Sequence, residues 1–143
     1  MTGRRTFLAW FLCALALAAG AAFAVRIGAA EAVWRGDASH MTSVIAVLCA
    51  ATVVWLGRAA WERDGIPVAY APSLAFAHLG ERLSVLLGLL GTVAGLSLQA
   101  TALAASGSAS FGALATGLYS TGTGIGSAVI ISVLAFVVER GAR

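Results

Sequence analysis

The residues of this chain that could do chemistry are hydroxyl and amide side chains set inside long apolar runs. Thr92 and Gln99 lie in one such run, and Thr121 and Ser132 lie in the next. These groups can hydrogen-bond a protonatable partner or a file of water, but they do not titrate near neutral pH. They could therefore line a polar path for protons. In a coupled proton channel, the group that gains and loses the proton would then have to come from another chain.

Glycines share a helical face with the first pair of polar residues. At 100° per residue, one face of a helix would hold Gly88, Thr92, Gly95 and Gln99, with Gly91 at its edge. Small faces let two helix backbones approach closely inside a membrane, and polar side chains there usually point at protein or water. We therefore expect this run to form an inner helix of an assembly.

The next apolar run carries two small faces. The first face holds Gly117, Thr121, Gly124, Ala128 and Ser132. On another face, Gly122 and Gly126 form a small-xxx-small pair. A helix with two such faces needs neighbours on two sides, which a closed ring of identical subunits would provide. A compact monomeric four-helix bundle with tight glycine seams fits the packing pattern equally well.

Composition indicates that these runs cross a membrane. Hydrophobic residues make up 60% of the chain and charged residues only 10%, against about 25% charged residues in a typical soluble domain. Four segments are long enough to span a bilayer: 6–25, 41–61, 83–105 and 111–138. We predict an all-α integral membrane protein with about four transmembrane helices. The last two should form an inner antiparallel hairpin across the short turn 106–110.

The arginines predict the orientation in the membrane. If the amino terminus is cytoplasmic, only Arg26 and Arg35 lie outside. The other seven of the nine basic residues then lie inside: Arg4, Arg5, Arg58, Arg63, Arg82, Arg140 and Arg143. Such a bias is typical of cytoplasmic loops. The chain is therefore expected to be a multi-pass protein of a bacterial inner membrane.

The amino-terminal segment has a second interpretation. Residues 4–8 resemble a twin-arginine export signal, and residues 22–24 resemble a small-x-small cleavage site. Cleavage would leave three membrane helices. We favour an uncleaved first helix because further spans follow, and the last two helices keep their orientation in either case.

The expected membrane segments divide the chain into three parts. Residues 1–62 contain two membrane helices, residues 63–82 form a short cytoplasmic loop, and residues 83–143 form the hairpin. We expect Pro67 and Pro72 to break any continuous helix in the loop.

The hairpin resembles the paired inner helices of the MotA/TolQ/ExbB proton-channel family. The resemblance rests on residues 88–95 (GLLGTVAG), followed after a short turn by the Thr- and Gly-rich residues 117–128. It implies a ring of subunits, commonly a pentamer, around the single membrane helices of a partner like MotB, TolR or ExbD. That partner would supply a membrane aspartate, and the ring threonines near it match Thr92 and Thr121. The resemblance thus implies a proton-conducting subunit driven by the proton-motive force, in a role such as protein transport.

The chain departs from the family pattern in two ways. The large cytoplasmic domain that usually precedes the first inner helix is reduced to residues 62–82, and Thr116 stands about where a glutamate is common. No carboxylate lies inside an expected span, while His40 and His78 are expected at interfaces or in loops. A coupled channel would therefore need its carboxylate from the partner.

The sequence favours neither an enzyme nor a nucleic-acid-binding protein. It contains no nucleophile–base pair, no metal-ligand spacing, no phosphate loop followed by lysine, and no basic stripe with interleaved aromatics. Neither a cofactor nor a metal is expected, and Cys13 and Cys49 should be small buried hydrophobic residues. Three classes remain: the proton-conducting subunit, a non-transporting membrane scaffold or degenerate channel relative, and a small four-helix exporter.

Overall fold

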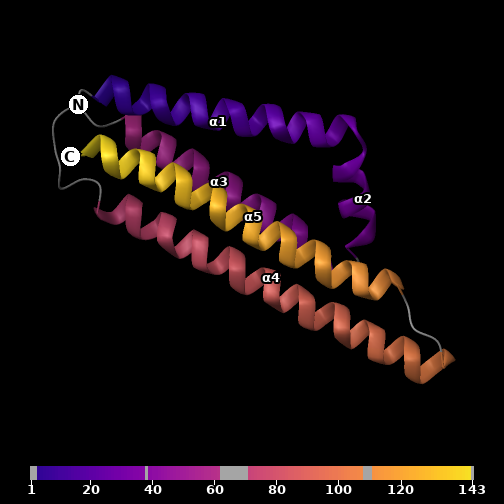
Figure 1. The fold of residues 1–143 in the computed structure, drawn as a ribbon. Helices are drawn as coiled ribbons and strands as arrows, with labels where there is room; N and C mark the ends of the chain where they lie inside the picture. The colour runs from indigo at the N-terminus through magenta and orange to yellow at the C-terminus, as the bar shows by residue number, and fades with distance from the viewer. Residues whose placement is uncertain (1–2, 38, 62–70, 108–110, 143) are drawn as a thin grey trace.

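The computed structural model describes residues 3–37, 39–61, 71–107 and 111–142. These residues form five helices: α1 (Gly3–Arg26), α2 (Ala29–Gly36), α3 (Met41–Trp61), α4 (Ala71–Ser106) and α5 (Phe111–Ala142), shown in Figure 1. All of them except α2 are long and apolar enough to cross a bilayer. The chain is an all-α multi-pass membrane protein with four candidate spans, as the sequence predicts.

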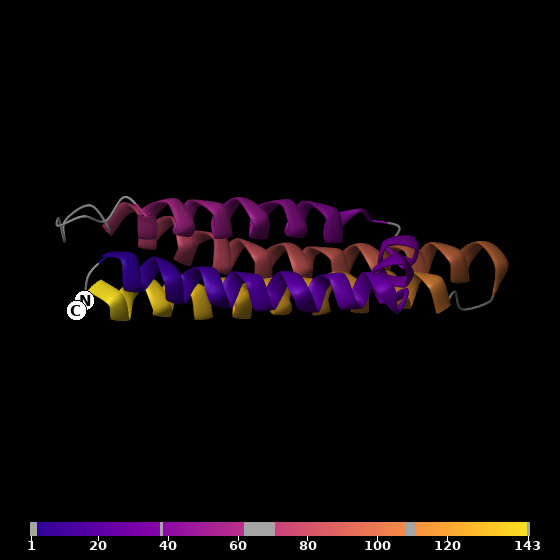
Figure 2. The same cartoon turned by 90° about the horizontal axis from the view of Figure 1, so that it is seen from above.

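The four long helices run along a common axis, and α2 lies across it (Figures 1 and 2). Helix α1 begins and α5 ends at the same end of the bundle, which we call the terminal end. The opposite end, where the chain passes from α4 to α5, we call the turn end. Helix α2 carries an exposed Trp34 and an ion pair of 2.5 Å between Arg35 and Glu31. Aromatic and charged side chains on a short transverse helix are typical of a membrane surface.

Helix α4 is longer than the apolar run that it contains. It begins at Ala71, so residues 71–82, which were expected to belong to a loop, are helical. Pro72 stands at the start of this helix rather than interrupting one, and proline is tolerated there because the first N–H groups have no intrahelical acceptor. Pro67 lies outside the described residues.

Gly107 ends α4 in a left-handed conformation. Its φ is +67°, and its N–H donates to the carbonyl oxygen of Leu103 at 2.9 Å. Glycine adopts this helix-ending geometry without the strain that a Cβ would add. The rest of the expected turn, residues 108–110, lies outside the described residues.

The bundle buries small hydroxyl side chains as well as apolar ones. Its interior holds small hydroxyl side chains such as Thr52, Ser84 and Ser120, each 0% exposed. Many large apolar side chains point outward, among them Leu118 at 74% and Phe136 at 55% exposure. Lipid tails are as apolar as these side chains, so large apolar side chains gain little by leaving the lipid. Small residues instead form the tight contacts between membrane helices.

An apolar core towards the terminal end holds α1 against the other helices. Leu56 of α3 and Ile131 of α5 are fully buried in this core, and Trp10 of α1 packs against it. The Phe7 and Trp61 rings meet edge to face with centroids 4.9 Å apart. The first apolar segment is thus a packed helix of the bundle.

Hydrogen bonds fix the link between α2 and α3. The Thr116 hydroxyl of α5 donates to the carbonyl oxygen of Gly36 at 2.9 Å. The Asp37 carboxylate accepts the N–H of Thr42 at 2.7 Å and the N–H and hydroxyl of Ser39 at 3.0 and 2.5 Å. Burial alone would raise the pKa of Asp37, but the hydrogen bonds from Ser39 and Thr42 outweigh burial and lower that pKa below its ordinary value.

Candidate functional site

Helices α4 and α5 pack antiparallel along a seam made of glycines. At the turn end of the seam, Gly95 lies against Ala113 and Gly117. A Cβ on Gly95 would stand 2.7 Å from the Gly117 nitrogen and 2.8 Å from the Ala113 carbonyl oxygen. Both atoms belong to the backbone, so no side-chain adjustment could make room. The hairpin can therefore close at this point only if residue 95 is glycine.

The seam continues towards the terminal end with the same register. Gly88 faces the backbone of Thr121 and Gly124, and a Cβ on Gly124 would stand 2.6 Å from the Ser84 carbonyl oxygen. Gly91, at the edge of the face, lies against the side chain of Ser120. The predicted small faces of the two runs therefore meet each other within one chain.

Thr92 and Thr121 meet between these glycine contacts. Their hydroxyl oxygens are in hydrogen-bond contact with each other across the seam. The Thr92 hydroxyl also lies 3.2 Å from the Gly88 carbonyl oxygen, and the Thr121 hydroxyl lies 2.8 Å from the Gly117 carbonyl oxygen. Cross-helix distances to the same carbonyls are 3.5 Å from Thr92 to Gly117 and 3.3 Å from Thr121 to Gly88. We call these two hydroxyls and two carbonyls the threonine cluster.

The threonine cluster has fewer hydrogens than acceptors. Each hydroxyl carries one hydrogen and can accept others, whereas each carbonyl can only accept. Two hydrogens are therefore shared among four oxygens, and either threonine can donate to a carbonyl or to the other threonine. Because both side chains are half-buried, the cluster can also exchange a hydrogen bond with a group that approaches from outside the seam.

The other two predicted path residues lie apart from the threonine cluster. Gln99 is half-buried, seven residues beyond Thr92 towards the turn end, or about 10 Å along the helix. Ser132 is eleven residues beyond Thr121 in the opposite direction, about 16 Å away. It lines a hollow of about 410 Å³ at the terminal end together with His78 and Glu139.

The His78 side chain lies near one carboxylate of α4 and one of α5. Its Nδ1 lies 3.5 Å from Glu81 Oε2, and its Nε2 lies 4.0 Å from Glu139 Oε1. All three side chains are at least one-third exposed. Between Glu81 and Glu139, residues 83–138 contain no aspartate or glutamate. Neither α4 after Arg82 nor α5 before Glu139 therefore supplies a carboxylate to the threonine cluster.

The remaining predicted glycines are divided between two surfaces. Gly117 lies in the seam, where a Cβ would be at an ordinary 3.4 Å from the Thr92 Cα. Gly122 and Gly126 are exposed, and a Cβ added at either would meet no atom of another helix within 4 Å. The first face of α5 thus serves the hairpin, and the Gly122–Gly126 face is open in the single chain.

Several buried hydroxyls escaped the sequence analysis. Ser84, Ser120 and Thr52 each donate to a carbonyl four residues earlier in their own helix, at 2.8, 3.0 and 2.8 Å. Such back-bonding satisfies the hydroxyl without a partner on another helix, so a polar residue can replace a small apolar one in a membrane interior. The helical phase offered a signal for Ser84, because it precedes Gly88 by one turn on the seam face.

Thr116 has a structural position. It is 1% exposed and its hydroxyl bonds the end of α2. Thr116 stands about where the family resemblance implies a glutamate, and it makes a packing contact inside the bundle instead.

No protein-family model, no curated protein and no solved structure matches the chain. A function can therefore be inferred only from the residues and their geometry.

Proposed function

We propose that this chain is a subunit of a proton-conducting membrane complex of the MotA/TolQ/ExbB kind, driven by the proton-motive force. The observation that supports it is the threonine cluster. Thr92 and Thr121 come from different helices, lie inside the spans Leu74–Ser106 and Phe111–Arg140 at the level where α3 begins, and share their hydrogens. Polar groups inside membrane-spanning helices are expensive to bury and are usually functional.

The protonation site in this proposal comes from a partner. Hydroxyls do not titrate near neutral pH, and residues 83–138 contain no carboxylate. A single-span partner resembling ExbD, TolR or MotB would bring an aspartate to the level of Thr92 and Thr121. An ionised carboxylate in a membrane needs hydrogen-bond donors, whereas a neutral one is free to leave. Alternation between these two states would couple proton passage to movement of the partner.

The threonine cluster is suited to that exchange. When a carboxylate approaches, either hydroxyl can turn from its carbonyl to the new acceptor, and the Gly88 and Gly117 carbonyls can take the hydrogen back afterwards. Neither step leaves a hydroxyl without an acceptor. Proton flow would then require only rotations of side chains and no opening of the glycine seam.

Charge distribution supports a bacterial inner-membrane location with the terminal end in the cytoplasm. Near that end lie the described residues Arg5, Arg58 and Arg140, while Arg26 and Arg35 lie towards the other end. An excess of arginine marks the cytoplasmic side of bacterial membrane proteins.

Proton flux into proteoliposomes tests the proposal directly. The chain would be reconstituted with and without its single-span partner, identified by co-purification, and flux would be followed with a pH-sensitive dye. We expect flux only with the partner. Thr92→Val and Thr121→Val keep the shape of the side chain and remove the hydroxyl, so each should lower flux at least tenfold.

A matched control is available on the same helix. Thr101 is exposed and bonds only the Ser97 carbonyl of its own helix, at 2.9 Å. Thr101→Val should leave flux unchanged. Full flux from this chain alone, or undiminished flux in the Thr92→Val/Thr121→Val double variant, would overturn the proposal.

A non-transporting scaffold is the second candidate. It is favoured by the closeness of the seam, in which backbone faces backbone at Gly95 and Gly124 and both threonine hydroxyls already have acceptors. Absence of flux with a stably bound partner would assign the chain to this class.

A further inference from the structure

A cluster of titratable side chains joins α4 and α5 towards the terminal end. His78 of α4 is at its centre, and its two ring nitrogens face different carboxylates: Nδ1 lies 3.5 Å from Glu81 Oε2, and Nε2 lies 4.0 Å from Glu139 Oε1. His78 and Glu139 also line the hollow of about 410 Å³ that Ser132 lines. We call His78, Glu81 and Glu139 the histidine cluster.

The histidine cluster and the threonine cluster lie on the same face of the hairpin. Glu139 follows Thr121 by 18 residues, which is about five full turns of α5. Glu81 precedes Thr92 by 11 residues, which is about three full turns of α4. The distance along α5 is about 27 Å, close to the roughly 30 Å thickness of the hydrocarbon core of a bilayer. One face of the hairpin therefore carries hydrogen-bonding groups at both ends of a distance that nearly crosses the membrane.

The members of the histidine cluster differ in depth. Helix α4 begins at the terminal end, so Glu81, three residues after His78, lies further from that end. Helix α5 ends there, so Glu139 lies nearer to that end than Ser132. The side chain of Glu81 is also the least exposed of the three, at 34%. The imidazole therefore stands between a deeper carboxylate and one nearer the aqueous side.

Two arginines accompany the two carboxylates. Arg82 follows His78 by four residues, about one turn of α4. The guanidinium of Arg140 stacks over the Phe136 ring at 5.2 Å, and Phe136 lines the hollow. The charges of the two glutamates and two arginines sum to zero. The described cluster with its arginines is therefore neutral while the imidazole is neutral, and it gains one positive charge when the ring takes a proton.

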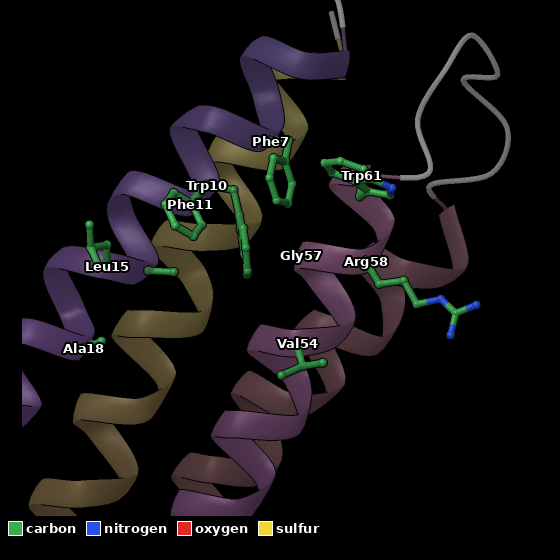
Figure 3. Close-up of a pocket in the computed structure, with 10 residues that line it drawn as sticks. Phe7, Trp10, Phe11, Leu15, Ala18, Val54, Gly57, Arg58 and Trp61 are labelled. Carbon is green, nitrogen blue, oxygen red and sulfur yellow. The ribbon is translucent and has the colours of Figure 1, made fainter.

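Helix α3 adds no described charged side chain to this side of α4. The two helices meet where the Trp55 and Phe76 rings lie with centroids 5.4 Å apart. His78 is two residues after Phe76, about 200° further around α4, and so lies on the side away from α3. Arg58, the charged residue of α3, lines the groove between α1 and α3 (Figure 3). The described charged groups that face His78 therefore come from α4 and α5.

We propose that His78 receives protons from the path that the threonine cluster begins and releases them to the cytoplasm. This inference rests on the proposed proton-conducting function. Between Thr121 and Ser132, a distance of about 16 Å along α5, the helix has no titratable side chain. In the proposed function the aspartate of the partner moves while it holds its proton, and the histidine cluster gives that proton a destination on the cytoplasmic side.

An imidazole is suited to this transfer because histidine changes its charge between pH 5 and 8. The neutral ring has a hydrogen on one nitrogen and a free electron pair on the other. Nδ1 takes a proton from the carboxyl group of Glu81 or from a water beside it, so that an N–H bond forms and an O–H bond breaks. Nε2 then gives its hydrogen to the Glu139 carboxylate or to cytoplasmic water. The ring returns to its first tautomer by proton exchange with water.

Proton efflux from acid-loaded proteoliposomes that contain the full chain and its partner tests the inference. Vesicles would be selected with a tag on the carboxyl terminus, so that the terminal end faces a weakly buffered medium. A positioned proton-transfer group typically contributes a factor of about 100 or more, and water can replace part of it at an exposed site, so His78→Gln should lower efflux about tenfold. A high concentration of a membrane-impermeant buffer in the medium should restore efflux, because a soluble base can then take the protons instead.

His40→Asn is the matched control. His40 is also an exposed histidine, but it lies at the other end of the bundle, just before α3, and its φ of 55° is one that asparagine tolerates. This variant should conduct like the native chain at either buffer concentration.

Undiminished efflux in His78→Gln would overturn the inference. A loss that added buffer does not restore would overturn it too, because the substitution would then act through the structure, and so would an equal loss in His40→Asn. These outcomes leave the proposed function intact, since the native chain conducts in each of them. No efflux from the native chain with its partner bound would instead overturn the proposed function and this inference together.

Discussion

Single residues set how closely the helices of this bundle approach. Gly95 and Gly117 face each other in the same seam, yet they differ in what a methyl group would meet. At Gly95 the nearest atoms are backbone atoms at 2.7 to 2.9 Å, whereas at Gly117 the nearest lies at 3.4 Å. Equivalent positions in the sequence pattern are thus unequal in the structure.

We predict that Gly95→Ala destabilises the bundle and that Gly117→Ala does not. Forcing a methyl group into a filled space typically costs about 1–3 kcal/mol, and the backbone of α5 must move to admit one at residue 95. Thermal unfolding in detergent, followed by circular dichroism, would measure both variants. Equal midpoints for Gly95→Ala and Gly117→Ala would contradict the seam geometry.

Asp37 is the second residue with a defined energetic role. Asp37 is 3% exposed, and its carboxylate accepts the N–H of Thr42 in the first turn of α3. Removing such a cap typically costs about 0.5–2 kcal/mol. We predict that Asp37→Ala lowers the thermal midpoint at pH 6, and that Ser39→Ala, which removes one of the hydrogen bonds to Asp37, lowers it less.

The effect of Asp37 depends on pH with a definite sign. The pKa of Asp37 in the folded state lies below its ordinary value of 3.8. The folded state therefore binds the proton less readily than the unfolded state, so the stabilisation is fully present above that value and is lost as the pH falls below it. The difference in midpoint between the native chain and Asp37→Ala should shrink at pH 3. A difference that grows on acidification would show that the carboxylate is not held as its anion.

At the scale of helices, hydropathy predicts the spans better than it predicts the helix ends. The run 41–61 coincides with α3, and the run beginning at residue 111 coincides with the start of α5. The start of α4 differs from the prediction because His78, Glu81 and Arg82 interrupt the apolar pattern. The structure nevertheless packs Leu74 and Ala77 against the apolar core beside α3 and α5, so the helix begins well before these polar residues. Pro72 adds to the error, since only its position in the first turn makes it compatible with the helix.

Helical phase predicts which faces are small, but it cannot predict what they face. Gly88 and Gly124 fall on the small faces by spacing alone, and the structure shows them against each other. That Thr92 meets Thr121 depends on the register between two helices, which the intervening turn and the glycine contacts set together. The burial of Ser120 could not be predicted from the sequence. Its hydroxyl donates to a carbonyl of its own helix, so it needs no polar partner on another helix that a pattern of polar faces would reveal.

At the scale of the whole molecule, the described part of the chain leaves the Gly122–Gly126 face of α5 uncovered. Gly122 and Gly126 lie on the outer side of α5, with open space at each, between the exposed side chains of Leu118, Ile125 and Val129. The seam with α4 uses the opposite small face. A ring of identical subunits, as we propose for this chain, would use the open face to bring a neighbour close.

We predict that the Gly122→Leu/Gly126→Leu double variant remains folded but no longer assembles. Added side chains meet no atom of their own chain at either position, so the thermal midpoint of the isolated subunit should stay the same, while a neighbouring helix would be pushed away. Gly20→Leu is the matched control, because Gly20 of α1 is also exposed with no atom within 4 Å, and it should assemble normally. Native mass spectrometry in nanodiscs would show a homo-oligomer for the native chain, expected to be a pentamer, and monomers for the double variant. A native chain that is strictly monomeric, or a double variant with an unchanged oligomer, would favour the compact monomeric bundle, in which the Gly122–Gly126 face meets only lipid.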